Sequence, residues 1–222
     1  MDKKPFETRS YNFEMRIMQS ERGEGVRTIT GRPIVFNSRT DLGWFDEIIE
    51  PGALDGTDLT DVRFLVNHDL SRIPLARSRR NNANSTLRLM PGQDGLDIET
   101  DLDVENNGTA RELVSAVDRG DISGMSFMFT IDDEEWQNLE SEHPTRRVKK
   151  IGSVIEVSAV TFPAYEDTEI KARDKAALES ARRELESARK TREANNKSLE
   201  SEKKRMLEIE KLKITILSKR GN

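Results

Sequence analysis

Three side chains of the sequence could act together as a nucleophile, a base and a group that orients the base. His68 ends the apolar run VRFLVNH, Ser126 lies in GMSFMF, and Glu156 is a charge within the apolar stretch SVIEVSAVTF. A histidine beside polar residues at a strand end can take a proton near neutral pH. A carboxylate in an apolar strand needs a partner, because burying it unpaired is costly. These types indicate nucleophilic catalysis by a hydroxyl, but spacing alone does not establish a triad.

Each of these residues also has an ordinary structural explanation. A single histidine is more often structural than catalytic, most serines do no chemistry, and Glu156 could face solvent from an edge strand. Ser123 and Ser158 compete with Ser126 for the role of nucleophile. Geometry must decide between these alternatives, because a triad is recognised by the arrangement of its members.

Composition removes several other kinds of site. The 222 residues include no cysteine and two histidines, which excludes thiol chemistry and zinc sites built from thiolates or several histidines. We expect no cofactor and no metal. No run of 18 apolar residues occurs and the N-terminus lacks a signal-peptide core, so we expect a soluble, intracellular protein with no membrane partner.

Short strands must position the three side chains. Alternating apolar residues predict strands through much of residues 11–170, and TLRLMPGQDGLDIETDL predicts a hairpin. The stretch GTARELVSAVDRG predicts a helix that Thr109 caps and Gly120 ends. In the strand GMSFMFTI, alternation places Ser126 opposite the face of Phe127 and Phe129, so we expect its hydroxyl to point into a cleft. The fold class is mainly β (α+β), and a closed or half-closed barrel would bury such strands.

A charged helical tail follows this β body. Residues 171–222 carry 16 Lys and Arg against 9 Asp and Glu, a net charge of +7, whereas the preceding 170 residues carry 20 against 32, or −12. Apolar residues recur every seven positions, as on the contact face of a coiled coil, but polar residues interrupt this repeat. One position of the repeat is occupied by Leu178, Leu185, Arg192, Leu199 and Met206. We predict a domain over 1–173 and a long, solvated helix over 174–222, which could form a weak coiled coil and self-associate.

Six sequence blocks in order resemble the tailed-phage prohead proteases, the serine proteases of capsid maturation. The blocks, spread over residues 11–173, are ITGRPIVFNS, LGWFDEIIEPGAL, VRFLVNHD, GLDIETDLD, RGDISGMSFMF and IEVSAVTFPAYEDTEIKAR. The resemblance implies a fold related to the herpesvirus capsid protease, a β-barrel with surrounding helices. It also implies that His68 and Ser126 are catalytic. One departure is Ala76, which stands where a glycine is expected before Arg77.

The resemblance leaves the third catalytic member open. The herpesvirus enzymes use a second histidine, for which this chain offers only His143, in a charged segment. The block IEVS offers Glu156 instead, and we predict that Glu156 takes this role. Arg77 is considered as an aid to backbone N–H donors for the oxyanion.

The resemblance also implies a biological setting. The substrate would be the scaffolding segment of the major capsid protein, with self-cleavage near KARDKAAL, inside the assembling prohead in the host cytoplasm. An inactive capsid scaffold with the same fold is the alternative. A nucleic-acid binder is disfavoured, because the tail mixes acids with its bases and has no aromatic residue.

Overall fold

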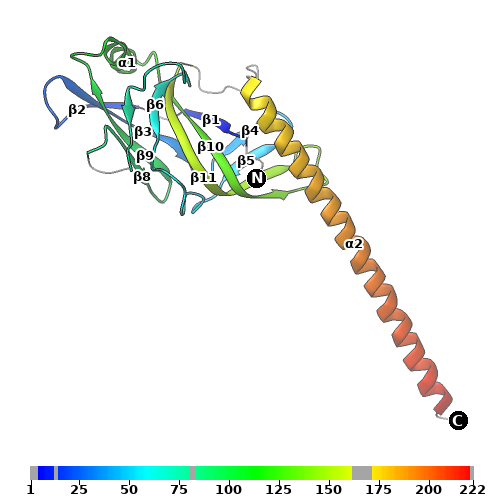
Figure 1. Cartoon of the computed structure of the whole chain (residues 1–222). Helices are drawn as coiled ribbons and strands as arrows, with labels where there is room; N and C mark the ends of the chain where they lie inside the picture. The colour runs from blue at the N-terminus through cyan, green and yellow to red at the C-terminus, as the bar shows by residue number, and fades with distance from the viewer. Residues whose placement is uncertain (1–4, 13–14, 81–83, 162–171, 221–222) are drawn as a thin grey trace. The chain divides into compact units, whose positions relative to one another are not determined.

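The computed structural model describes residues 5–12, 15–80, 84–161 and 172–220 (Figure 1). The chain forms two compact units, Met1–Leu178 and Glu179–Asn222. The predicted end of the β domain at Arg173 falls near the boundary between these units and stays a prediction. The end of the last sequence block, over residues 162–171, lies outside the described residues, as does Lys171 of the predicted self-cleavage junction.

The first unit is built on two β-sheets. Within the described residues, the larger sheet has seven strands in the order β1-β10-β11-β5-β4, and β11 also pairs with β6, which pairs with β7. Their bounds are β1 Glu7–Asn12, β4 Arg39–Asp41, β5 Asp46–Ile49, β6 Arg63–Val66, β7 Ala76–Arg77, β10 Gly124–Gln137 and β11 Thr145–Val160. The smaller sheet has the order β2-β3-β9-β8, with β2 Arg16–Gln19, β3 Val26–Val35, β8 Leu87–Pro91 and β9 Gly95–Asp103.

A long hairpin of β10 and β11 organises the larger sheet. The two strands pair antiparallel from Gly124↔Val160 to Gln137↔Thr145, with register shifts between Met128 and Glu134. Such irregularities bend a strand and increase its twist. The first part of β11 pairs parallel with β5, and its last part pairs parallel with β6, so β11 connects both halves of the sheet.

The two sheets enclose one hydrophobic core. Ile29, Leu96 and Ile98 from the smaller sheet join Met125 and Phe127 from β10 in this core. Gly31 of β3 shows how closely the sheets approach, because a Cβ there would come within 2.3 Å of the Met125 sulfur. The predicted mainly β fold is confirmed, but among the described residues neither sheet closes into the barrel that the resemblance implied. Strands β5 and β6 both pair in parallel with β11, so the larger sheet branches at β11. In the described part of the chain no pairing joins its outer strands β1 and β4.

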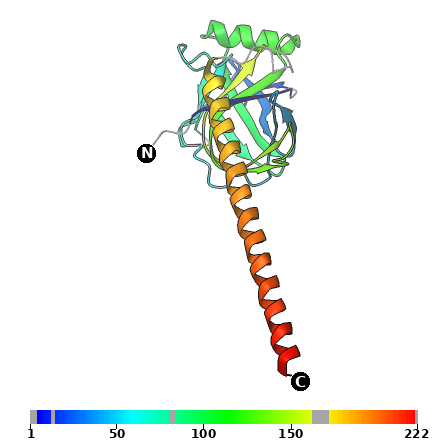
Figure 2. The same cartoon turned by 90° about the vertical axis from the view of Figure 1, so that its right-hand side faces the viewer.

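Local sequence signals predicted several elements. The hairpin over residues 87–103 is confirmed as β8 and β9, with Leu89 opposite Ile98. The predicted helix is confirmed as α1, Gly108–Asp118, which lies at one end of the first unit (Figure 2) and buries Ala110, Leu113 and Val117. Its cap is Asn107, whose side chain accepts a hydrogen bond from the Ala110 N–H, and not Thr109.

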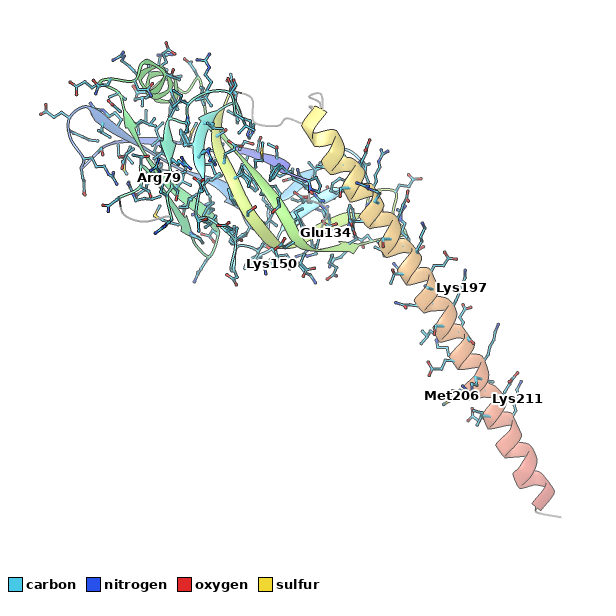
Figure 3. The ribbon with its side chains drawn as sticks, viewed as in Figure 1. Arg79, Glu134, Lys150, Lys197, Met206 and Lys211 are labelled. Atoms are coloured by element: carbon cyan, nitrogen blue, oxygen red, sulfur yellow. The ribbon has the colours of Figure 1, made fainter. Side chains whose placement is uncertain are left out.

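The second helix, α2, runs from Ala172 to Arg220 and confirms the predicted long helix. Leu199, Met206 and Leu207 are exposed along it. Lys197, Met206 and Lys211 project from the helix in Figure 3, and Lys197 pairs with Glu193 one turn earlier at 2.7 Å. From residue 186 to residue 211 nearly every side chain is exposed, as in a solvated helix, whereas Ala177, Ala181 and Leu185 are buried. Coiled-coil pairing stays a prediction.

Candidate active site

His68 and Glu156 lie in direct contact. The His68 Nδ1 is 2.5 Å from the Glu156 Oε1, and the Glu156 side chain is buried completely. An ionised carboxylate only accepts hydrogen bonds, so this contact is suited to an imidazole that has its proton on Nδ1. The parallel register of β6 and β11, which places Glu156 beside Arg63 and Ala159 beside Val66, carries the histidine to this carboxylate. Glu156, the charged residue within an apolar strand, therefore has His68 as its partner.

The turn that presents His68 has an unusual backbone. Asn67 and His68 have φ values of 52° and 56°, in the left-handed region that non-glycine residues rarely adopt. The end of β11 holds this turn, since the Asn67 N–H donates to the Ala159 carbonyl at 2.9 Å. The Asn67 side chain also donates to the Thr161 hydroxyl at 3.0 Å and accepts from the Thr161 N–H at 2.9 Å. Strained conformations of this kind persist where surrounding contacts over-determine them, and they cluster at functional sites.

Ser158 lies between the two members of this pair. Its hydroxyl donates to the Glu156 Oε2 at 2.5 Å and accepts from the backbone N–H of His68 at 3.2 Å. The Ser158 side chain is buried. Sequence reasoning treated Ser158 only as a competing nucleophile and missed this bridging position.

Ser126 lies one strand away from Ser158. The two serines are opposite each other in the register of β10 and β11, and Met128 is likewise opposite Glu156. Met125, Phe127 and Phe129 belong to the hydrophobic core, whereas Ser126 and Met128 do not, as the strand alternation predicted. Directly opposed side chains in an antiparallel pair have Cβ atoms ~5 Å apart. Ser126 therefore shares one face of the sheet with Ser158 and Glu156.

The Ser126 hydroxyl has other partners than His68. It donates to the Arg9 carbonyl of β1 at 2.7 Å and accepts from the Ser10 hydroxyl at 2.9 Å. Within residues 5–12, 15–80, 84–161 and 172–220, no hydrogen bond joins Ser126 to His68, and Ser126 is fully buried where an open cleft was expected. Ser123 is exposed and precedes β10.

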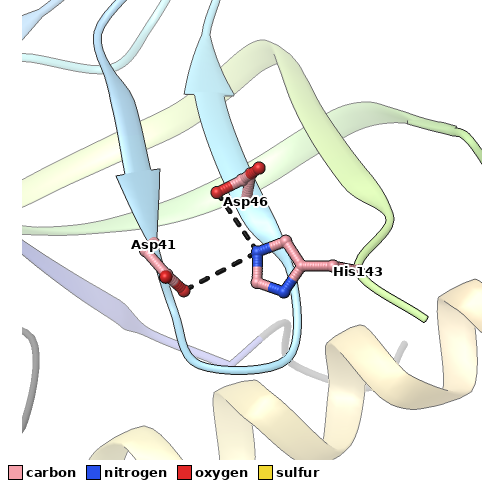
Figure 4. Close-up of side chains that lie close together, drawn as sticks. All are labelled: Asp41, Asp46 and His143. Atoms are coloured by element: carbon pink, nitrogen blue, oxygen red, sulfur yellow. Dashed lines mark ion pairs between the residues drawn. The ribbon is translucent and has the colours of Figure 1, made fainter. Parts of the chain in front are cut away.

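Two further candidates lie elsewhere. The Arg77 guanidinium donates two hydrogen bonds to Asp61, at 2.6 and 2.8 Å. The side chain considered as an oxyanion donor is therefore already paired. His143 lies just before β11, whereas Glu156 and Ser158 lie near the other end of that strand. Its Nε2 is 3.2 Å from Asp46 and 3.7 Å from Asp41, on the β4–β5 hairpin (Figure 4).

Asp41, Asp46 and His143 are also the one group in the described part of the chain with the spacing of a metal site, since their ligand atoms lie within 4.8 Å of one another. Ion pairs account for the arrangement. Asp46 is bound by both His143 and Arg39, and Asp41 accepts the N–H of Gly43. This group includes His143 but none of His68, Ser126, Ser158 and Glu156.

Residues 13–182 match the family model of the caudovirus prohead serine proteases, and the matched span contains His68, Ser126 and Glu156. The chain belongs to this family. The predicted class, a serine protease of phage capsid maturation, therefore holds at the level of the family, as does an association with capsid proteins within the prohead.

The other comparisons add no relative of this chain. No curated protein and no solved structure matches the chain. The predicted relation to the herpesvirus capsid protease therefore stays a prediction. In the part of the chain that the structure describes, no helix has the length and apolarity needed to cross a membrane.

The first unit also contains a buried ionic network that includes Arg9, whose carbonyl accepts the Ser126 hydroxyl. Arg9 of β1 and Arg146 of β11 each pair with both Glu7 and Glu47, and all four side chains are 6% exposed or less. The Arg9 guanidinium bonds Glu47 at 2.5 and 2.9 Å, while the Arg9 carbonyl accepts the Ser126 hydroxyl. The network thus anchors the strand that contacts Ser126.

Burial and charge act in opposite directions within this network. Burial alone would raise the pKa of the Glu47 carboxyl, but the attraction of Arg9 and Arg146 outweighs it and lowers the pKa to about 2. Burial lowers and the two glutamates raise the pKa of Arg9, with a net rise. Sequence reasoning missed this network because charges that alternate along a strand, as in ETRSYN, usually mark a solvated face.

Proposed function

We propose that this chain is an active serine endopeptidase that cleaves the scaffolding segment of the major capsid protein, and itself, inside the prohead. The single observation that carries the proposal is the contact between the His68 Nδ1 and the buried Glu156 Oε1 at 2.5 Å, on the sheet face that also carries Ser126. A carboxylate bound to Nδ1 fixes the imidazole with its other nitrogen unprotonated.

In the proposed mechanism, Ser126 is the nucleophile, His68 the base and Glu156 the orienting group. The Ser126 hydroxyl turns from the Arg9 carbonyl toward the His68 Nε2, which takes its proton as the oxygen attacks the scissile carbonyl. The imidazolium returns this proton to the leaving amine, and water then hydrolyses the acyl-enzyme by the same route. Catalytic hydrogen bonds are often formed only once substrate is bound, so the contact between Ser126 and Arg9 is compatible with this role.

Two observations favour Ser126 over the other serines. The Ser158 hydroxyl lies on the Nδ1 side of the His68 ring, bound to Glu156, and cannot give its proton to Nε2 in this arrangement. Ser123 is exposed and precedes β10, so it is not among the residues of β10 that pair with β11. Ser126 is the serine that faces this row from the neighbouring strand.

An inactive capsid scaffold is the second candidate. The full burial of Ser126 and the hydrogen bond from its hydroxyl to Arg9 favour this candidate. In that case, the family fold would serve assembly, and the long charged helix α2 would contact other capsid proteins.

Co-expression with the cognate major capsid protein tests the proposal. We expect the wild-type chain to shorten the capsid protein, and Ser126→Ala to leave it at full length while remaining folded. Ser123→Ala is the matched control and should cleave normally. A wild-type chain that never shortens the capsid protein favours the scaffold, and cleavage by Ser126→Ala but not by Ser123→Ala moves the nucleophile to Ser123.

A further inference from the structure

Ser158 donates one hydrogen bond to the candidate catalytic pair and accepts another from it. A hydroxyl has one proton to donate, and that of Ser158 goes to the Glu156 Oε2 at 2.5 Å. The Ser158 oxygen accepts a hydrogen bond from the backbone N–H of His68 at 3.2 Å. The Ser158 side chain is fully buried, so water does not compete for these positions.

The donation to Oε2 determines which carboxylate oxygen faces the imidazole. A terminal carboxylate torsion is broad, so an unbonded Glu156 would rotate between several orientations. With Oε2 bound by Ser158, Oε1 is left for the His68 Nδ1 at 2.5 Å. A hydrogen bond to an ionised group is also stronger than one between neutral groups.

The hydrogen bond that the Ser158 hydroxyl accepts from the His68 N–H restrains the backbone of His68. The left-handed φ of 56° at His68 costs free energy, and local contacts must compensate for it. The neighbouring Asn67 N–H is bound by the Ala159 carbonyl, so β11 binds two successive amides of the turn through adjacent residues. Ser158 thereby connects the position of the His68 backbone to the position of the carboxylate that orients its ring.

We propose that Ser158 is a positioning residue, which fixes Glu156 and the His68 backbone relative to each other so that the imidazole Nε2 faces the nucleophile. This inference rests on the proposed function for its catalytic consequence, but the hydrogen bonds themselves can be tested without activity. Ser158 acts through Glu156 and His68 and does not touch the substrate.

The test compares Ser158→Ala with Ser153→Ala. Ser153 is a serine on the same strand whose hydroxyl bonds Thr130 at 3.1 Å, away from His68. Because a hydrogen bond to a charged group is lost, Ser158→Ala should lower kcat about 10- to 100-fold with little change in KM. Ser153→Ala should retain kcat within about twofold, since it removes a neutral hydrogen bond that is remote from the pair.

Proton NMR provides a readout that a merely structural role would not change. The proton between Nδ1 and Oε1 should give a strongly downfield imidazole signal in the wild type and in Ser153→Ala, because short bonds to a carboxylate deshield the proton. In Ser158→Ala, this signal should move upfield or exchange with water. Should Ser158→Ala not fold, hydrogen exchange of the wild-type chain still tests the second contact, as the His68 amide should be protected.

The outcomes separate this inference from the proposed function. An unchanged downfield signal and unchanged kcat in Ser158→Ala would overturn the positioning role, while wild-type proteolysis would stand. Exchange of the wild-type His68 amide at the rate of a free peptide would also overturn it. If the wild type does not cleave the capsid protein yet the signal depends on Ser158, the proposed function fails and the geometric assignment stands.

Discussion

Replacement of Arg146 by methionine should destabilise the first unit, Met1–Leu178, severely. The Arg146 side chain is 2% exposed, pairs with Glu7 and Glu47, and lies over the rings of Phe45 and Trp136 at 5.2 and 5.9 Å. Methionine keeps much of the apolar contact but removes the charge. The three charged groups that remain, Arg9, Glu7 and Glu47, would then carry one uncompensated negative charge in the interior. Glu134 would also lose its contact with Arg146 at 3.3 Å.

The magnitude follows from the burial of this charge. Removing one partner of a buried ion pair costs about 3–5 kcal/mol, because the remaining charge stays desolvated. For a domain of this size, 1 kcal/mol corresponds to about 2–4 °C in Tm, so the expected drop is about 6–20 °C. Arg9 belongs to the same network, and its backbone carbonyl accepts the hydrogen bond of the Ser126 hydroxyl. Proteolysis should therefore fall as folded protein is lost.

Thermal unfolding of matched variants measures this effect. Arg147 is the control, since it is the next residue on β11, is half-buried and pairs only with Glu50 among the contacts described. Arg147→Met should cost about 0–1 kcal/mol, as for an accessible ion pair. Adding Glu47→Gln to Arg146→Met restores charge balance and should recover part of the lost stability. Equal Tm values for Arg146→Met and Arg147→Met would refute this reasoning.

Three further predictions concern pH, the third catalytic member and the tail. The pKa of Glu47 is lowered from 4.5 to about 2 in the folded protein, so the ionised carboxylate stabilises the fold fully above pH 4.5 and this stabilisation is lost as the pH falls toward 2. Urea titrations should show that the free energy of unfolding falls by about 3 kcal/mol over this pH window. The Glu47→Gln variant should lack that loss. Glu156→Gln should lower kcat more than about 100-fold, as expected for the orienting member of a triad, while His143→Ala should retain activity; the opposite result in peptide assays would give the role to His143. A chain that ends at Leu178 should cleave a soluble substrate yet fail to enter proheads, because the removed helix would supply the charged docking surface, and normal entry would exclude that role for the tail.

The sequence by itself determined the local elements and the family. The hairpin over residues 87–103, the helix α1 and the long helix α2 follow from apolar periodicity and turn residues, which act between near neighbours in the chain. The same periodicity assigned Ser126 to the face opposite Phe127, and six ordered blocks indicated the family that the comparison establishes.

Only the tertiary structure decided which of these residues meet. Glu156 reaches His68 through the parallel pairing of β11 with β6, across 88 positions of sequence, and Arg9 reaches Glu47 across 38. A charged residue in a strand has the same local pattern whether it faces water or a buried partner, so the ionic network and the bridging role of Ser158 have no local signature. The branching of the sheet at β11 likewise depends on which strands pair, a choice made by long-range burial that strand periodicity does not encode.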